Sequence, residues 1–374
     1  MKKKILFMSE EEARTTLYCA GYSGDFEMLV VGNIERNKTI QFHPMCDRFI
    51  NLKNTLTLEG DTSALVVEII EVIKREAVDL LLPISLVCLK LVDQNRAAFA
   101  KHVNIGPCPT EEVLELLDDK YKFYQFCLQN GISHPKSVLA KSWQDIDPAN
   151  VGVEFPILIK PLLGAGGFST LVFAENRAQL ETFLNSSEEK KQKYFPALVQ
   201  EYFDGEDIDL NGYSLNGKIL ASSVMRTEFY EKNRELSFTS FVRDDEVKRL
   251  GEKVLALSGY SGPANIDMRI RKSDGELMLI EVNPRYWARV AASIFDGINF
   301  VDVGIRASLG EDVKVESKAG GGEWISSFGL LLKAILKDGK LSYIKHVFAI
   351  TKFQIQLVLF NRRLDKKAAK LLAQ

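Results

Sequence analysis

The chain has 374 residues, a hydrophobic fraction of 46%, a charged fraction of 26% and a formal net charge of −2 at pH 7. This composition is that of a globular protein with two or three domains, and the balanced charge argues against a nucleic-acid partner. Five dispersed cysteines and four dispersed histidines suggest neither a disulfide framework nor a zinc cluster. The longest apolar run, residues 78–92, is interrupted by charges and is too short to span a bilayer, so we expect a cytoplasmic protein.

The first hundred residues alternate between strand-like and helix-like segments. Residues 4–8, 28–33 and 78–84 are short apolar runs typical of buried strands, and residues 64–75 have apolar positions at helical spacing. This alternation predicts a parallel α/β domain over residues 1–107. The loop after the first strand is acidic and glycine-poor, which argues against a nicotinamide cofactor and favours a scaffold domain beside a substrate cleft.

A second domain is predicted over residues 108–320. Its start lies within the Gly-Pro-Cys-Pro-Thr sequence at 106–110, which marks the boundary, and residues 111–129 have the pattern of one amphipathic helix. Glycines at 320–322 mark a linker, and residues 321–374 form a basic, helical extension with ten Lys or Arg against two acids from Leu331 onward. Helices that cap the preceding domain are the favoured interpretation of this extension, over a peripheral membrane or partner-binding face.

A lysine and a glycine-rich loop follow one another in residues 155–170, FPILIKPLLGAGGFST. Lys160 ends an apolar strand, and Gly164, Gly166, Gly167 and Ser169 follow it. Glycines allow backbone N–H groups to approach an anion closely, and a neighbouring cation adds to phosphate binding. Because no Lys-Ser/Thr pair follows the glycines, the segment is not a P-loop, and a hairpin turn without function is its alternative interpretation.

Two further segments carry weaker signals. Residues 197–203 read as a strand that breaks at Asp204-Gly205, with Glu206 and Asp209 just beyond it. Acids after a strand end can accept hydrogen bonds from ribose hydroxyls, although acids near turns are usually solvated. Arg226 follows a run of small and apolar residues, and either a cleft position or a structural salt bridge accounts for it.

The strongest signal is a predicted hairpin formed by residues 264–270 and 277–283. If it turns at Asp274, positions that sum to 548 lie opposite one another, so Asp267 faces Glu281 and Asn265 faces Asn283 on one side of the sheet. Directly opposed like charges are destabilising, which calls for a cation between them. Carboxylates with an amide oxygen are ligands typical of Mg²⁺, and the sequence therefore predicts a metal–nucleotide site.

The order of these motifs resembles the ATP-grasp superfamily, in its biotin-carboxylase-like and carbamoyl-phosphate-synthetase-like branch. The similarity covers about residues 1–310: Asp-Lys before a helix, Ile-Lys-Pro, the glycine loop, Gln-Glu-Tyr, and then GPANIDMRI with LIEVNPR. It implies an N-terminal parallel α/β domain followed by a two-lobed ATP-grasp domain, with a mobile lobe at about 135–203. It also implies ATP and Mg²⁺ as cofactors, with Mn²⁺ as an alternative ion.

The resemblance implies a role for each matching residue. Lys120 and Lys160 would contact the ATP phosphates, and the loop from Gly164 to Thr170, with Gly166, Gly167 and Ser169, would cover them. Gln200, Glu201, Tyr202 and Phe203 would form the adenine hinge, and Asp209, or equally Glu206, would bind ribose. Asp267, Glu281 and Asn283 would hold the metal, and Arg285 would face the transferred phosphate, so that the catalytic set is Arg285, Lys160 and Asn283.

The expected activity is a ligase reaction that joins a small carboxylate to an amine through an acyl phosphate, with release of ADP and phosphate. Candidates for the acceptor side are Arg285, Arg289, Arg226 and Trp287, although core packing explains Trp287 equally well. A bicarbonate-using carboxylase and a non-catalytic nucleotide-binding scaffold are the alternatives. The sequence does not set the oligomeric state, and a homodimer is a plausible arrangement.

Overall fold

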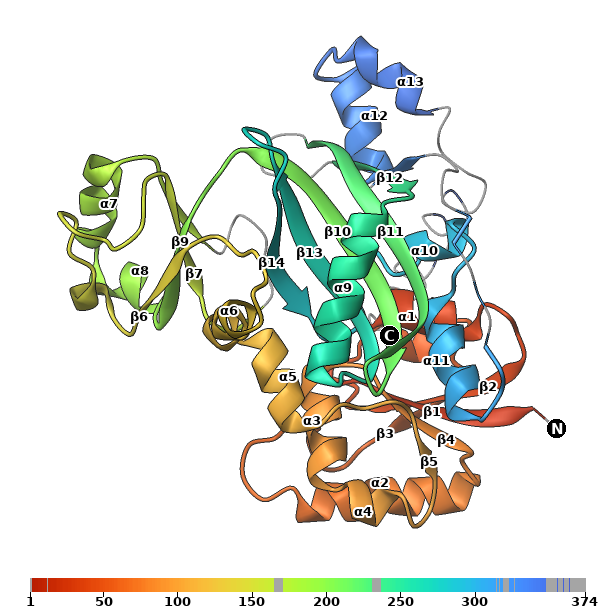
Figure 1. The fold of residues 1–374 in the computed structure, drawn as a ribbon. Coiled ribbons are helices and arrows are strands. Elements are labelled where there is room, and N and C mark those ends of the chain that lie inside the picture. Colours follow the sequence, from red (N-terminus) through yellow and green to blue (C-terminus); the bar gives the residue numbers. More distant parts are fainter. Residues whose placement is uncertain are drawn as a thin grey trace.

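The computed structural model describes residues 2–11, 13–164, 171–230, 237–313, 315, 317–318, 323–325, 327–347, 355, 359 and 363. Within this part, the chain forms sheets of five, four and six strands, each with helices packed against it (Figure 1). The expected combination of an N-terminal parallel α/β layer with antiparallel sheets after it is confirmed.

The first sheet is parallel and has the strand order β3-β2-β1-β4-β5. Its elements are β1 (Lys3–Met8), α1 (Arg14–Gly21), β2 (Phe26–Gly32), β3 (Arg48–Asn51), α2 (Ser63–Glu76), β4 (Leu80–Pro83), α3 (Leu86–Gln94), α4 (Arg96–Phe99) and β5 (Asn104–Ile105). Residues of β1 pack alternately into two clusters, one on each face, which explains why its sequence is continuously apolar. The edge strands β3 and β5 were not predicted, because they are short and partly polar.

Two helices replace the single helix predicted over residues 111–129. Helix α5 (Glu111–Asp118) begins after Thr110, whose side chain accepts a hydrogen bond from the Val113 amide. The helix then breaks at Asp119, which caps α6 (Lys120–Gln129) by accepting from the amides of Tyr121 and Lys122. The break places Lys120 on the first turn of α6, where its backbone amide donates to Leu162 O at 3.1 Å.

The second sheet belongs to a small lobe that stands apart from the rest in Figure 1. It has the antiparallel order β6-β9-β7-β8, with its own apolar cluster. The elements of this lobe are β6 (Ser137–Ala140), β7 (Ile157–Pro161), β8 (Val172–Ala174), α7 (Arg177–Leu184), α8 (Glu188–Gln192) and β9 (Ala197–Glu201).

The third sheet has six strands in the antiparallel order β14-β13-β10-β11-β12-β15. One face is covered by α9, and α10 and α11 lie on the other side (Figure 1). The elements are β10 (Gly205–Leu215), β11 (Lys218–Tyr230), β12 (Ser237–Val242), α9 (Asp245–Ser258), β13 (Gly262–Arg271), β14 (Leu277–Asn283), α10 (Ala292–Phe295), α11 (Phe300–Ser308) and β15 (Glu323–Ile325).

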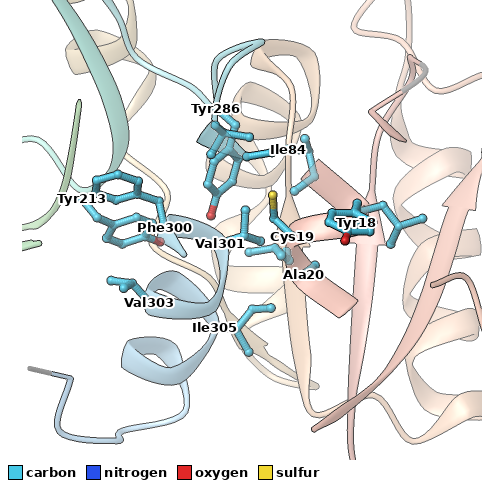
Figure 2. Packing of buried hydrophobic residues seen from close by; sticks show 14 of the residues in the cluster. Tyr18, Cys19, Ala20, Ile84, Tyr213, Tyr286, Phe300, Val301, Val303 and Ile305 are labelled. Atoms are coloured by element: carbon cyan, nitrogen blue, oxygen red, sulfur yellow. The ribbon is translucent and has the colours of Figure 1, made fainter. Parts of the chain in front are cut away.

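One apolar cluster joins the first sheet to the third. Figure 2 shows Tyr213 of β10, Phe300 of α11 and Cys19 of α1 within it. The side chain of Asn299 adds a polar link by donating to Cys19 O at 2.7 Å. Residues 280 positions apart are therefore held in contact, and the third sheet is anchored on the first.

Residues 327–347 contain α12 (Phe328–Leu336) and α13 (Ile344–Val347), which pack on β12 and β15. Strand β15 precedes them and extends the third sheet. The prediction of a helical extension is therefore wrong for residues 323–325, which form a strand. The predicted glycine linker and most of residues 348–374 lie outside the described residues. Among the described helices, none combines the length and the apolar composition that crossing a bilayer requires.

Candidate functional site

A cleft of about 810 Å³ lies between the small lobe and the third sheet. Most of the predicted site residues that the structure describes line it, Glu206 and Arg226 excepted: Lys120, Lys160, Gly164, Gln200, Glu201, Tyr202, Phe203, Asp209, Asp267, Glu281, Asn283 and Arg285. Gly166, Gly167 and Ser169 lie outside the described residues. The fold thus brings together residues up to 165 positions apart, as counted from Lys120 to Arg285.

The end of β9 connects the two walls of the cleft. The amides of Glu201 and Tyr202 donate to Lys136 O at 2.9 Å and to Pro156 O at 2.8 Å. Within the described part of the chain, the Phe203 amide has no such partner. Among Glu201, Tyr202 and Phe203 of the predicted hinge, Phe203 therefore retains a backbone donor for a planar ligand.

Two lysines enter the cleft from different elements. Lys160 on β7 is buried and donates to the Gln200 side chain at 2.6 Å, while Lys120 on α6 donates to Gly164 O at 3.1 Å. Burial lowers the pKa of Lys160 to about 8, and the carboxylates of Glu281 and Asp267 partly offset that effect. The Lys120 ammonium lies 3.9 Å from Glu281, so both lysines lie within the field of the acidic hairpin.

The hairpin of β13 and β14 has the predicted register at its functional end. Asp267 lies opposite Glu281 and Asn265 opposite Asn283, whereas a bulge after Asp267 shifts the remaining pairs by one residue. The side-chain amide nitrogen of Asn283 donates to the side-chain oxygen of Asn265 at 3.0 Å and to the carboxylate of Asp267 at 3.4 Å. The prediction that positions sum to 548 is therefore right at the site and wrong beyond the bulge.

The donor set fits a hard divalent cation. Burial, together with the charges of Asp209 and Glu281, raises the pKa of Asp267 well above its usual range, and a cation between these carboxylates would oppose that increase. Within the described residues, no group of three or more His, Cys, Asp or Glu is arranged to hold a metal alone. Asp267 and Glu281 would therefore need the Asn283 oxygen and ligand oxygens to complete a shell, as Mg²⁺ sites usually do.

Asp209, for which a ribose role is predicted, lies next to the acidic hairpin. It is opposite Asp267 in the sheet, is buried, and pairs with Arg289 at 3.2 Å. Burial raises its pKa to about 6, with Arg289 opposing the increase and Asp207 adding to it. Its surroundings are those of the metal hairpin and not those of the hinge.

Asp207 was missed by the sequence reasoning. It lies on the same face of β10 as Asp209, two residues nearer the hinge, and lines the cleft. Arg269, whose guanidinium also stacks 5.0 Å from the Tyr202 ring centre, contacts it at 2.8 Å. Glu206 points to the opposite face of the strand and does not line the cleft. The strand period, applied to β10, could have found Asp207.

The acceptor candidates divide between the two faces of the sheet. Arg285, Trp287 and Arg289 line the cleft, and Trp287 also packs 5.2 Å from the Phe300 ring in the core. Arg226 does not line it: its side chain pairs with Asp244 at 3.7 Å on the α9 side. The salt-bridge interpretation of Arg226 is therefore the correct one. Lys193 lines the cleft as well, although no motif marks it.

Comparison with known proteins shows which proteins this chain resembles in sequence. Residues 117–289 match the family model of the ATP-grasp domain. The arginine-specific carbamoyl phosphate synthase large chain of Bacillus subtilis is 23% identical over 214 residues, which cover 54% of this chain and 20% of that protein. The chain thus spans about a fifth of the length of the curated relatives it matches.

Solved structures with the same fold cover more of the chain. The biotin carboxylase domain of Hydrogenobacter thermophilus 2-oxoglutarate carboxylase, solved with MgADP, ADP and bicarbonate, has a TM-score of 0.65 at 17% identity, over 87% of this chain and 74% of that one. An L-amino acid ligase from Bacillus licheniformis has a TM-score of 0.60 at 18% identity, over 82% and 74% of the two chains. At these identities the likeness concerns the fold.

Proposed function

We propose, from the ATP-grasp domain that residues 117–289 of this chain form, that the protein is an ATP-dependent ligase joining a small carboxylate to an amine. The observation that carries the proposal is the meeting of Lys120, Lys160 and the Asp267–Glu281–Asn283 hairpin in one cleft. Cations and paired carboxylates on facing walls suit a metal-bound triphosphate. The carbamoyl phosphate synthase relatives and the amino acid ligase fold support the same class of chemistry.

The nucleotide would lie along the cleft from the hinge to the hairpin. The Phe203 amide would donate to the adenine edge, and Tyr202 and Leu158 would flank the ring. For the ribose we favour Asp207 over the predicted Asp209 and Glu206, because it lines the cleft near the hinge. Lys160, Lys120 and the loop that starts at Gly164 would contact the phosphates.

Asp267, Glu281 and Asn283 would hold Mg²⁺, with Mn²⁺ as a second ion of suitable chemistry. Bound there, the ion would neutralise charge on the transferred phosphate and allow both carboxylates to remain ionised. Lys160, Asn283 and Arg285 are the proposed catalytic residues, since Asn283 belongs to the hairpin and Lys160 and Arg285 line the same cleft.

The proposed reaction has two balanced steps. An oxygen of the acid attacks the γ-phosphorus, the bond to the bridging oxygen breaks, and ADP leaves with that electron pair. The amine nitrogen then attacks the acyl carbon, loses a proton, and phosphate leaves with the oxygen of the acid. Lys160 and Arg285 offset the charge that develops on phosphate, and closure of the small lobe would exclude water from the acyl phosphate.

An ATP-dependent carboxylase that uses bicarbonate is the second candidate within this fold, favoured by the bicarbonate complex of the biotin carboxylase domain. A non-catalytic scaffold is the third, and the complete set of lysines and ligands argues against it. Domain boundaries at 107 and 320, a mobile lobe at about 135–203, a cytoplasmic location and a homodimer also stay proposals.

Release of ADP in the presence of pooled amino acids and carboxylates tests the proposal. We expect turnover by the wild type and a loss of at least about a hundredfold in Glu281→Ala, because a proposed metal ligand is removed. Glu252→Ala on the exposed face of α9 is the matched control and should retain full activity. Undiminished turnover in Glu281→Ala would overturn the metal assignment, and ATP binding without turnover on any pool would favour the scaffold.

A further inference from the structure

Helices α12 and α13 and the turn between them expose large apolar side chains at one end of the molecule. One face of α12 is buried, with Leu331, Ala334 and Ile335 packed against β12 and β15. In contrast, Leu336, Leu341 and Ile344 are 77%, 67% and 43% exposed. Figure 1 shows α12 and α13 at the end of the molecule opposite to α2, beyond the tip of β12.

Positive charge surrounds these exposed side chains. Lys333, Lys337 and Lys345 are exposed, and no carboxylate lies within 4 Å of them among the described residues. Asp338 is the one acid in the sequence from 327 to 347. We call the six residues Lys333, Leu336, Lys337, Leu341, Ile344 and Lys345 the α12–α13 tip.

We propose that the α12–α13 tip docks on an anionic lipid surface. Leucines flanked by lysines are typical of segments that lie in the membrane interface, where apolar side chains enter the acyl boundary and ammonium groups meet the headgroups. A protein partner fits less well, because lysine is depleted in protein interfaces and the tip offers no Trp or Arg anchor. The contact would be peripheral, since no described helix can span a bilayer.

The apolar component is tested by flotation of the full chain with phosphatidylcholine vesicles that contain phosphatidylglycerol. Each exposed leucine should contribute roughly tenfold to partitioning, so Leu336→Ser/Leu341→Ser should lower binding by about a hundredfold. Leu128→Ser/Leu257→Ser, at exposed leucines on α6 and α9, should bind as the wild type does. All four positions are exposed, and an unchanged Tm would confirm that the variants fold.

The charge component is tested with the same vesicles and with vesicles of phosphatidylcholine alone. Neutralising Lys333, Lys337 and Lys345 to Gln should lower binding about fivefold for each lysine, and salt should weaken it. Equal binding to the two lipid mixtures, or no binding to either, would overturn the proposal. Flotation of the leucine variant at the wild-type level would also overturn it. The same holds if light scattering shows that the leucine variant differs from the wild type only in having lost self-association.

Discussion

At the residue scale, Lys160 is the side chain whose surroundings most constrain its chemistry. Burial lowers its pKa to about 8, far below that of an exposed lysine, and only Gln200 accepts a hydrogen bond from its ammonium among the described residues. Its charge is present below about pH 8 and is lost as the pH rises through that value. We therefore expect the KM for ATP to rise above pH 8.

Two lysine-to-methionine variants separate the contribution of Lys160 to the KM for ATP from the effect of removing any positive charge. Lys160→Met should raise the KM for ATP by about ten- to a hundredfold at pH 7, the range for a charge-assisted contact, and should remove the rise above pH 8. Lys122→Met, on the exposed side of α6, should keep both values. A wild-type KM that is constant from pH 7 to 9 would contradict the assignment of Lys160 to phosphate.

Asp207 and Asp209 differ in their expected effect on sugar recognition. If Asp207 binds ribose, Asp207→Ala should reduce the discrimination between ATP and 2′-deoxy-ATP by about tenfold or more, because the partner of the hydroxyl is removed. Asp209→Ala should preserve the discrimination while lowering kcat, since Asp209 lies beside Asp267. Loss of discrimination in Asp209→Ala alone would restore the original ribose prediction. Steady-state kinetics with the two nucleotides measures both.

The sequence predicts the positions of single residues correctly where the local structure is a regular strand, in which side chains alternate with a period of two residues. The hairpin of β13 and β14 has alternating side chains and a clear turn, so the pairing of Asp267 with Glu281 could be predicted. The bulge after Asp267 could not, because no residue type there marks it. The pairing of Asp209 with Arg289 depends on two segments 80 positions apart, which only the tertiary fold brings together.

At the element scale, the break between α5 and α6 links helix capping to the site. Asp119 caps α6 and thereby sets Lys120 on its first turn, next to Leu162 and Gly164. Asp119→Ala should lower the free energy of unfolding by about 1 kcal/mol and raise the KM for ATP. Asn176→Ala removes the cap of α7 and should cost similar stability without changing that KM. Equal KM values in both variants would show that the cap does not position Lys120.

The contact between α11 and β10 is the second element-scale test. A Cβ at Gly304 would come within 2.5 Å of the Tyr213 hydroxyl in the cluster that joins the two larger sheets. Gly304→Ala should therefore lower the free energy of unfolding by about 1–3 kcal/mol, as overpacking does. Tyr213→Phe in the same background should recover part of the loss. Denaturant unfolding measures both, and a neutral Gly304→Ala would contradict the tight packing.

Predicting the elements succeeded where burial is strong and failed where it is weak. The central strands β1, β2 and β4 are apolar on both faces, and their sequences identify them. The edge strands β3, β5 and β15 are two to four residues long, so their pairing depends on neighbours that the local sequence does not contain.

At the scale of the whole molecule, two of the three sheets form the cleft and the other one supports them. The small lobe contributes Lys160 and the hinge, the third sheet contributes the acidic hairpin, and the first sheet packs against the base of the third. The α12–α13 tip lies away from the first sheet, at the other end of the molecule (Figure 1). Membrane docking at that tip and ligation in the cleft are therefore separable properties, and each can fail without the other.

The most direct test of the central claim follows oxygen from the acid into phosphate. The enzyme is incubated with ATP and a pool of amino acids and other carboxylates labelled with oxygen-18 in the carboxyl group, and the released phosphate is analysed by mass spectrometry. Acyl-phosphate chemistry predicts phosphate that carries one labelled oxygen, with no label when only bicarbonate is labelled. Phosphate labelled from bicarbonate would identify the carboxylase instead, and ADP release with unlabelled phosphate in both experiments would contradict the account.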